Sequence, residues 1–264
     1  MIMKKMKYIV WFVWIIFLCW MVFAESWKGI VSPWFLWFSS LFTKKSPKQF
    51  PKLPLLSGEV SPQWTTSKGF PLIEIAWVTY VDGYLIVNKT YPLPYDFVPS
   101  DTFEEATRKD DCLRCIHSTA YQAFETMKSD AKKEWINIFI VSWYRSYRKQ
   151  KNLYSAYVQR DGKKNADRYS ARPWNSEHQS SLSFDLNSVS NDFWNTKEWK
   201  WLDQNAYKYW FILRYPKNKE KETWYMYEWW HFRYVGEFLS KKLRNWWDWI
   251  SLEEYFWLSS EYPS

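Results

Sequence analysis

Glycine, histidine and cysteine are all scarce in this chain. Its 264 residues include six glycines, three histidines and three cysteines, beside 22 tryptophans. Three cysteines are too few for the dense disulfide framework that stabilises many small secreted domains. The histidines stand at positions 117, 178 and 231, so any site that needs two imidazoles must use two of these. Glycine accounts for about 2% of the residues, far below the roughly 7% of an average protein.

The chain also lacks an apolar run long enough for an ordinary transmembrane helix. Residues 8–23 form an apolar run of sixteen residues, whereas a spanning helix needs about 20. Three lysines precede this run and the small residue Ala24 follows it, which is typical of a signal peptide or signal anchor over residues 1–24. We therefore expect an extracytoplasmic protein, secreted to the cell envelope or in contact with the membrane through this N-terminal segment.

Most of the sequence has almost no excess of basic over acidic residues, although the formal net charge of the chain is +8. Residues 1–52 carry eight lysines and one glutamate, and the remainder carries 28 basic and 27 acidic side chains. Since nucleic-acid binding needs a basic surface on the folded domain, we expect no nucleic-acid partner. Prolines and lysines without hydrophobic periodicity make residues 25–72 a linker, which leaves residues 73–258 as one folded domain.

Hydrophobic periodicity predicts both helices and strands in this domain. Some segments have apolar residues at helical spacing, and others alternate or form short apolar runs, as strands do. We expect an α+β fold in which helices flank one antiparallel-rich sheet. The predicted helices are 120–133, 147–158, 201–210 and 234–245, and the predicted strands are 73–81, 84–88, 136–142, 182–187, 211–214 and 231–235.

Two short stretches of the sequence hold the residue types of a catalytic zinc site. His178, Asp185 and His231 supply two imidazoles and one carboxylate, which suit zinc better than an all-carboxylate set does. The alternation over residues 182–187 predicts a half-buried strand with Asp185 on its polar face. We expect Glu228 to be the general base, because a fourth protein ligand would close the position that a catalytic site keeps for water. The alternative is that both histidines are structural, since neither stretch is a standard zinc motif.

Several further motifs follow one another along the chain in a recognisable order. They include Ser-Trp-Tyr-Arg-Ser-Tyr at 142–147, Leu-Arg-Tyr-Pro at 213–216, Tyr-Glu-Trp-Trp-His at 227–231 and Leu-Glu-Glu-Tyr at 252–255. Over about 170 residues the chain resembles the VanY and LdcB type of zinc D,D- and L,D-carboxypeptidases, which trim peptidoglycan stem peptides. The resemblance implies a Hedgehog/D-peptidase-like zinc peptidase fold, zinc as cofactor, removal of a C-terminal D-alanine, and a monomer.

The resemblance also implies roles for four more residues. Arg145 would stabilise the oxyanion or grip the terminal carboxylate of the substrate, since a planar guanidinium suits both groups. Gln150 would line the site beside it. Ser176 and Arg172 would make further substrate contacts.

Two other functions are compatible with the same ligand pattern. One is a zinc D-Ala-D-Ala dipeptidase of the VanX kind, and the other is a catalytically inactive wall-binding module. The presence of Glu228 favours an enzyme, because a binding module could keep the zinc ligands and lose the base. The motifs do not separate D,D- from L,D-specificity.

Tryptophan occupies several positions where the resemblance implies glycine. A gene that uses UGA for glycine, translated with UGA read as tryptophan, would explain this pattern and the low glycine content. The alternative is a protein that is naturally rich in tryptophan. Ser181 also stands at a usual glycine position, and the UGA hypothesis does not explain it. The tryptophans concerned are Trp135, Trp143, Trp174, Trp194, Trp199, Trp210 and Trp224.

Cys112 and Cys115 are the two cysteines outside the N-terminal apolar run. With His117 they could form a metal or redox site, and an exported protein could oxidise them. The simpler interpretation is two neighbouring positions on a helix that starts after Asp110 and Asp111.

Overall fold

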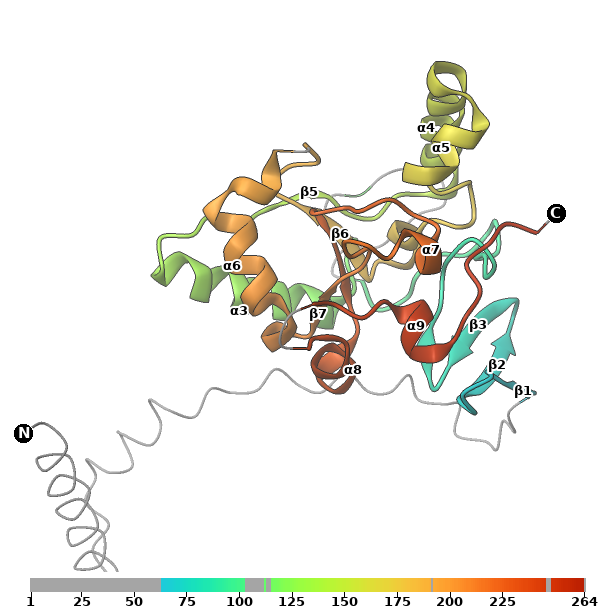
Figure 1. The fold of residues 1–264 in the computed structure, drawn as a ribbon, viewed down its shortest axis with the longest axis horizontal. Helices are drawn as coiled ribbons and strands as arrows, with labels where there is room; N and C mark the ends of the chain where they lie inside the picture. The colour runs from blue at the N-terminus through green and yellow to red at the C-terminus, as the bar shows by residue number, and fades with distance from the viewer. Residues whose placement is uncertain (1–62, 103–111, 113–114, 191, 246–247, 264) are drawn as a thin grey trace, which may run out of the picture. The chain divides into compact units, whose positions relative to one another are not determined.

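The computed structural model describes residues 63–102, 112, 115–190, 192–245 and 248–263. The predicted signal segment at 1–24 and most of the predicted linker at 25–72 lie outside these residues. None of the helices in the described ranges is both long and apolar enough to cross a membrane. The described chain has the α+β composition expected from its periodicity, but the strands form two antiparallel sheets of four strands each (Figure 1). The expectation of a single sheet was wrong.

The first sheet is a simple meander. Its strands are β1 (Trp64–Thr65), β2 (Pro71–Ile75), β3 (Val78–Val81) and β4 (Tyr84–Leu85), paired in that order. The predicted strand 73–81 is therefore split, because Ala76 and Trp77 have φ angles of 49° and 64° and form a tight two-residue turn. Strand pairing starts at Trp64, inside the stretch that composition assigned to the linker.

The second sheet carries the central residues of the domain. It consists of β5 (Ile140–Ser142), β6 (Ser183–Leu186), β7 (Phe211–Leu213) and β8 (His231–Tyr234), in the order β5-β6-β8-β7. Strands β6 and β8 pair so that Phe184 faces Phe232 and Asp185 faces His231. All four residues of β6 are buried, so the expectation of a half-buried strand was wrong. Its polar side, too, is covered by protein.

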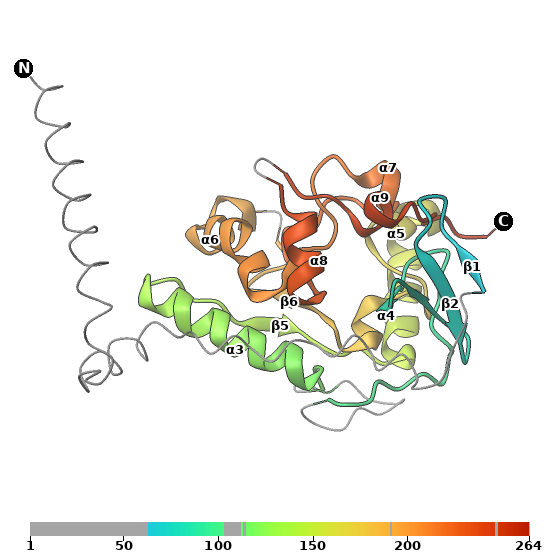
Figure 2. The same ribbon diagram turned by 90° about the horizontal axis from the view of Figure 1, so that it is seen from below.

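Helices surround this second sheet, as the sequence periodicity predicted. Figures 1 and 2 show α3, α6 and α8 grouped around it, whereas α4 and α5 form a hairpin that projects from the domain in Figure 1. The α-helices are α3 (Ser118–Lys133), α4 (Tyr147–Asp161), α5 (Lys163–Tyr169), α6 (Lys197–Asn205), α7 (Glu220–Thr223), α8 (Gly236–Leu243) and α9 (Leu252–Phe256), and the 3₁₀ helices are η1 (Glu177–Ser180), η2 (Phe193–Asn195) and η3 (Ala206–Tyr209).

Aromatic rings fill the space between α3 and the second sheet. Phe124 of α3 lies 5.5 Å from Phe184, and Phe184 lies 5.1 Å from Phe211, measured between ring centroids. None of these three side chains is more than 2% exposed. Complete burial of such a ring contributes roughly 1.5–3 kcal/mol, so this cluster anchors β6, which carries Asp185.

Six tryptophans of the described chain have a positive φ, where any side chain with a Cβ is strained and glycine is favoured. Trp210, Trp224 and Trp257 end η3, α7 and α9 in the left-handed conformation, the usual place of a terminal glycine. Ser181 ends η1 in the same way, with a φ of 60°. The other three tryptophans are Trp77, Trp135 and Trp174.

These angles bear on the seven tryptophans that stand where glycine was expected. Four of the seven have a positive φ, and Trp77 and Trp257 join them although the sequence did not single them out. Trp143, Trp194 and Trp199 have ordinary φ angles, so backbone conformation does not require glycine there.

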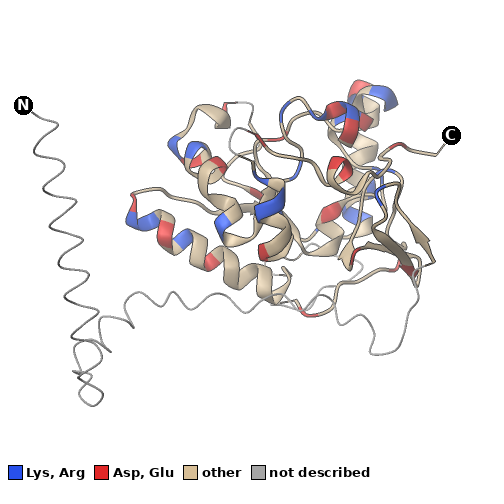
Figure 3. Ribbon diagram, turned by 60° about the horizontal axis from the view of Figure 1, so that its bottom comes forward, with Lys and Arg blue, Asp and Glu red and all other residues tan. Residues whose placement is uncertain are grey.

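Charged side chains of both signs are interspersed on the outer helices (Figure 3). Lys133 pairs with Asp130 on α3, and Lys241 pairs with Glu237 on α8. This mixture agrees with the near-neutral balance of the sequence after residue 52.

Cys112 and Cys115 form a disulfide with their Cα atoms 5.2 Å apart. Cys115 is fully buried and precedes α3, so the interpretation as two neighbouring helix positions was wrong. Cys112 pairs with the backbone of Tyr144, the residue before Arg145. The disulfide therefore supports the segment that leads from β5 into α4.

Candidate metal centre

Three elements bring His178, Asp185 and His231 together. His178 lies on η1, while Asp185 and His231 face each other across β6 and β8. His178 Nε2 is 3.4 Å from Asp185 Oδ2, and His231 Nδ1 is 3.2 Å from Asp185 Oδ1. Ligands at about 2.0–2.1 Å from a tetrahedral zinc ion are roughly 3.3 Å apart, so both distances fit. All three ligand atoms lie within 4.8 Å of one another.

The polar atoms of this cluster are buried with few partners of their own. Each of the three residues is 4% exposed. Within the described residues, Asp185 Oδ1 and His231 Nε2 make no hydrogen bond. Leaving polar groups unsatisfied away from water is costly, and a bound cation would compensate the carboxylate. The donor set and its burial therefore fit zinc.

Local contacts prepare two of the ligands to bind a metal. His178 Nδ1 lies 2.7 Å from the carbonyl oxygen of Trp143, a contact that places the ring proton on Nδ1 and leaves Nε2 free. Burial alone would raise the pKa of Asp185, but the neighbouring His178 and His231 outweigh it and hold this pKa well below its usual range. Asp185 is therefore an ionised carboxylate, the form that a metal ligand must have.

Glu228 lies just before β8, with its Oε2 atom 3.6 Å from His231 Nδ1. The residue is 7% exposed. Burial raises its pKa to about 7, an effect that the positive charge of His231 opposes and the negative charge of Asp185 reinforces. A carboxyl group with a pKa near neutrality can both take and return a proton, which suits a general base and acid.

Arg145 is held beside Asp185 by a set of directed contacts. Its Nη2 atom is 3.8 Å from Asp185 Oδ2 and donates to Ser142 Oγ at 3.0 Å. Its Nη1 atom donates to Gln150 Oε1 at 2.8 Å. Gln150 is 1% exposed and donates to the carbonyl of Ala171 at 2.6 Å. Gln150 thus orients the guanidinium.

A cavity of about 420 Å³ opens onto the metal cluster. Ser176 lines it, as the resemblance implied for a substrate contact. Arg172 instead lines a second cavity, where it forms a bidentate ion pair with Asp167. Its Cζ atom lies 3.6 Å from the ring centroid of Tyr262. The structure therefore brings Ser176 to the metal cluster and places Arg172 elsewhere. The cavity is lined further by Leu153, Tyr157, Arg160, Tyr169, Tyr215, Met226 and Trp230.

Sequence reasoning missed two residues of this region, Glu177 and Tyr215. Glu177 is completely buried, with its Oε2 atom 3.5 Å from His231 Nε2. The ring of Tyr215 lies 5.0 Å from that of His231. Both residues stand inside motifs of the sequence, directly before His178 and directly after Arg214, so the motifs were the available signal.

The chain is similar to several known proteins. The D-alanyl-D-alanine carboxypeptidase (VanY) family matches residues 114–237. Bacillus subtilis (strain 168) has a protein named as a carboxypeptidase, YodJ, that is 43% identical over 185 residues. That match covers 65% of this chain and 66% of the Bacillus protein, so the chain spans just under two thirds of that relative's length.

Two solved structures are also similar to this chain. The LdcB LD-carboxypeptidase is 36% identical, with a TM-score of 0.60 over 73% of this chain and 95% of that one. A vancomycin-resistance D,D-pentapeptidase VanY variant from a VanB-type cassette, in complex with Zn(II), is 25% identical. Its TM-score is 0.50 over 60% of this chain and 90% of that one.

Proposed function

Because the chain belongs to the D-alanyl-D-alanine carboxypeptidase family of the VanY and LdcB type, we propose that it is a zinc-dependent carboxypeptidase that removes the C-terminal D-alanine from peptidoglycan stem peptides. One observation carries the proposal: Asp185 and His231 face each other across β6 and β8, with His178 within reach of Asp185 and Glu228 beside His231. This arrangement combines three metal ligands with a separate base. The similarity to a VanY structure that contains Zn(II) supports the choice of metal.

His178, Asp185 and His231 would hold the metal. When bound, zinc supplies a Lewis acid at an open coordination position, where it lowers the pKa of water. The buried ligands exclude competing solvent from the protein side, and the cavity of about 420 Å³ admits the substrate. The end of a stem peptide is of a size that such a cavity accommodates.

Glu228 performs the proton transfers of the proposed reaction. It takes a proton from the water that attacks the carbonyl carbon of the terminal peptide bond, and it returns this proton to the nitrogen of the leaving D-alanine. The tetrahedral intermediate then collapses as the carbon–nitrogen bond breaks. The burial that raises the pKa of Glu228 to about 7 suits both halves of this transfer.

Arg145 supplies the fixed positive charge of the site. A carboxypeptidase must recognise a free terminal carboxylate, and a guanidinium that Gln150 and Ser142 already orient is prepared for such an anion. Its side chain is 18% exposed, so it can still reach a ligand in the cavity. We assign Arg145 to the terminal carboxylate and Ser176 to a polar substrate contact.

The proposal also includes the compartment and the partners. The substrate is part of the cell wall, so the protein would act outside the cytoplasm, as a monomer, after export by its N-terminal segment. Such a compartment allows the disulfide between Cys112 and Cys115 to persist.

Digestion of defined muropeptides tests the function. The full-length chain, loaded with zinc, is incubated with pentapeptides that end in D-Ala-D-Ala and with tetrapeptides that end in L-Lys-D-Ala, and the products are weighed by mass spectrometry. We expect loss of one alanine from at least one of them. Release of the dipeptide D-Ala-D-Ala alone would instead identify a dipeptidase, and no product from either substrate would favour a wall-binding module.

Glu228→Gln is the matching variant, because it keeps the shape of the side chain but cannot accept the proton. Turnover should fall by about 10²–10⁴-fold while zinc content stays unchanged. The control is Glu237→Gln on the outer surface of α8, which should leave turnover unchanged. If Glu228→Gln loses zinc together with activity, Glu228 is a ligand and the proposed mechanism is wrong.

A further inference from the structure

A series of buried ion pairs leads away from the metal ligand His231. Its first member is Glu177, whose side chain has no exposed surface. Oε2 of Glu177 accepts a hydrogen bond from Ser183 at 3.0 Å and lies 3.5 Å from His231 Nε2. Since His231 Nε2 has no hydrogen-bond partner within the described residues, Glu177 is the carboxylate placed to receive its proton.

Arg214 holds Glu177 from the opposite side. Its side chain is also without exposed surface, and its Nε atom donates to Glu177 Oε1 at 2.7 Å. Both of its terminal nitrogens donate to Glu253, at 2.9 Å and 2.8 Å. Glu253 accepts a further hydrogen bond from Asn88 at 3.0 Å. Two carboxylates far apart in the sequence thus fix one guanidinium, and Asn88 holds the second of them.

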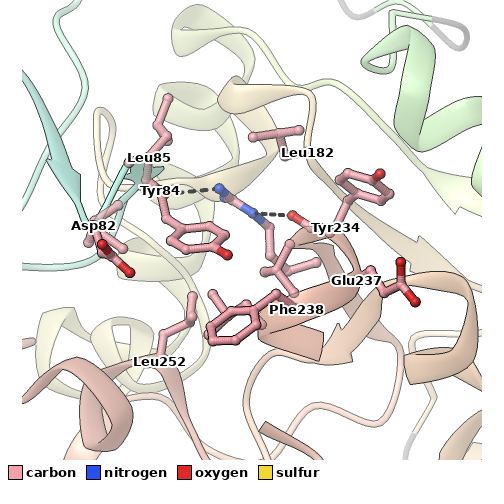
Figure 4. Close-up of a pocket in the computed structure, with 14 residues that line it drawn as sticks. Asp82, Tyr84, Leu85, Leu182, Tyr234, Glu237, Phe238 and Leu252 are labelled. Atoms are coloured by element: carbon pink, nitrogen blue, oxygen red, sulfur yellow. Dashed lines mark hydrogen bonds between the residues drawn. The ribbon is translucent and has the colours of Figure 1, made fainter. Parts of the chain in front are cut away.

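A second arginine, Arg233, also faces Glu177. Its Nη1 atom is 3.5 Å from Glu177 Oε1. Its other nitrogens donate to the carbonyls of Leu85 and Tyr234 at 3.0 Å and 3.1 Å, the two dashed contacts of Figure 4. The guanidinium borders a small cavity of about 90 Å³ there, lined mostly by apolar residues such as Leu182 and Leu252. Arg233 is therefore fixed in place between this cavity and Glu177.

Two guanidinium groups face one oxygen of Glu177, and His231 faces the other. Arg214 Nε and Arg233 Nη1 lie 2.7 Å and 3.5 Å from Glu177 Oε1, while Oε2 lies 3.5 Å from His231 Nε2. A carboxylate oxygen beside Nε2 favours the imidazole form with its proton on Nε2 and its lone pair on Nδ1, the atom that faces Asp185.

A contribution to folding stability does not by itself explain why these charged side chains are buried together. Buried ion pairs are often no more stabilising than apolar residues of the same volume, because desolvation offsets the attraction. Among the side-chain contacts of this network in the described part of the chain, the one with a metal ligand joins Glu177 Oε2 to His231 Nε2. This contact is explained if the network serves to orient the imidazole ring of His231.

We propose that Glu177 is a positioning residue that fixes the ring and tautomer of His231 for metal binding through Nδ1, with Arg214 as the group that holds Glu177 in place. The inference rests on the zinc site of the proposed function. It extends that site to residues that touch neither the metal nor the substrate.

Zinc affinity separates this role from a general contribution to folding. The full-length chain, Glu177→Gln and Glu253→Gln are titrated with zinc against a chelator of known affinity. Both variants remove one of the two carboxylates that neutralise Arg214, but only Glu177 faces His231. We expect a 10–100-fold loss of zinc affinity for Glu177→Gln and a change below about threefold for Glu253→Gln. Equal losses in the two variants would overturn the proposal.

A measurement on the unchanged protein covers the case in which Glu177→Gln does not fold. The chain has three histidines, so the ring nitrogens of the zinc-loaded, ¹⁵N-labelled protein can be assigned by NMR. We expect His231 to bind zinc through Nδ1 and to carry a proton on Nε2. Zinc on Nε2 of His231 would overturn the proposal.

Different results would contradict the proposed function and the proposed role of Glu177. A wild-type chain that binds no zinc contradicts the proposed function and, with it, the role of Glu177. A chain that binds zinc but hydrolyses no stem peptide contradicts the function alone, because the affinity ratio of the two variants and the state of His231 still decide the role of Glu177.

Discussion

His178 Nδ1 lies 2.7 Å from the carbonyl oxygen of Trp143, the residue that follows β5. This contact joins the first metal ligand to the segment that carries Arg145. The backbone N–H of Arg145 in turn donates to the carbonyl of His178 at 3.3 Å. His178, a proposed metal ligand, and Arg145, the proposed partner of the terminal carboxylate, therefore lie on one pair of adjacent backbone segments.

The first prediction concerns this ligand. His178→Ala removes one of three protein ligands, so zinc affinity should fall by more than the ~10–100-fold that loss of a supporting contact costs. The check is metal analysis of the purified protein after dialysis. His117→Ala is the control, because His117 lies outside the cluster, and it should retain full zinc content. Stoichiometric zinc in His178→Ala would refute the ligand assignment.

The second prediction concerns the terminal carboxylate. Arg145→Lys keeps the charge but loses the planar pair of donors, so kcat/KM for peptides ending in D-alanine should fall. Arg145→Ala should cost more, about 2–4 kcal/mol of transition-state binding.

Amidation of the substrate is the matched control for that variant. It removes the negative charge from the peptide, so it should reduce cleavage strongly in the wild type and much less in Arg145→Ala. Equal effects of amidation on both proteins would show that Arg145 does not bind the terminal carboxylate, and its role would then be to stabilise the oxyanion.

The third prediction concerns the tryptophans with positive φ. Trp77 and Trp257 are 79% and 61% exposed, so little packing is lost when either becomes glycine, and a left-handed strain of about 1–2 kcal/mol is relieved. Trp77→Gly and Trp257→Gly should each raise the free energy of unfolding by about 1 kcal/mol in urea titrations. Trp201→Gly, which empties a buried position on α6, should lower it by at least 3 kcal/mol.

The gene itself provides a fourth test. If UGA encodes glycine in the source of this chain, the six tryptophans with positive φ should all be UGA codons. Trp201 and Trp230, where the resemblance implies tryptophan, should be UGG. Sequencing the codons, or weighing the native protein, decides the question. UGG at Trp77 and Trp257 would mean that these strained tryptophans are real.

The fifth prediction concerns pH. His117 Nδ1 accepts the backbone N–H of Thr119 at 3.3 Å and caps α3. Burial lowers the pKa of His117 below 6.5, against the opposing charge of Asp101. When a histidine has a lower pKa in the folded state than in the unfolded state, the protein loses stability as the pH falls below the unfolded-state pKa of about 6.5. A helix cap contributes about 1 kcal/mol, so the free energy of unfolding of the wild type, measured by urea titration, should fall by that order between pH 7.5 and 5.

The matched variant is His117→Asn, which caps a helix without titrating. The difference in unfolding free energy between the two proteins isolates His117 from the other histidines. This difference should shift in favour of His117→Asn as pH falls. A difference that is constant with pH would contradict the role of His117.

The sequence predicted several local features of this protein. The scarcity of histidine singled out His178 and His231, which the structure brings together with Asp185, and helical spacing predicted the buried face of α3. The turn at Ala76 and Trp77 was missed, because neither residue carries the turn signal that glycine or asparagine would.

Long-range pairings could not be predicted in the same way. The division of the strands into two sheets depends on contacts such as Asp185 with His231, which periodicity does not encode. The position of Arg172 shows the same limit, since its ion pair with Asp167 turns it away from the metal cluster. The charged partners of Glu177, Arg214 and Arg233, lie 37 residues or more along the chain, so motif order alone could not reveal them.

The sequence separation within the Arg214 network has a consequence for how the domain assembles. Asn88 and Glu253 are 165 residues apart, and Arg214 and Glu253 are 39 apart. Arg214 has its full counter-charge only after these distant segments have met, and contacts of such high sequence separation slow folding. Glu177 and the proposed metal ligands beside it would therefore reach their final geometry only with this closure. On the proposed function, zinc binding and hydrolysis would then require completion of the whole domain.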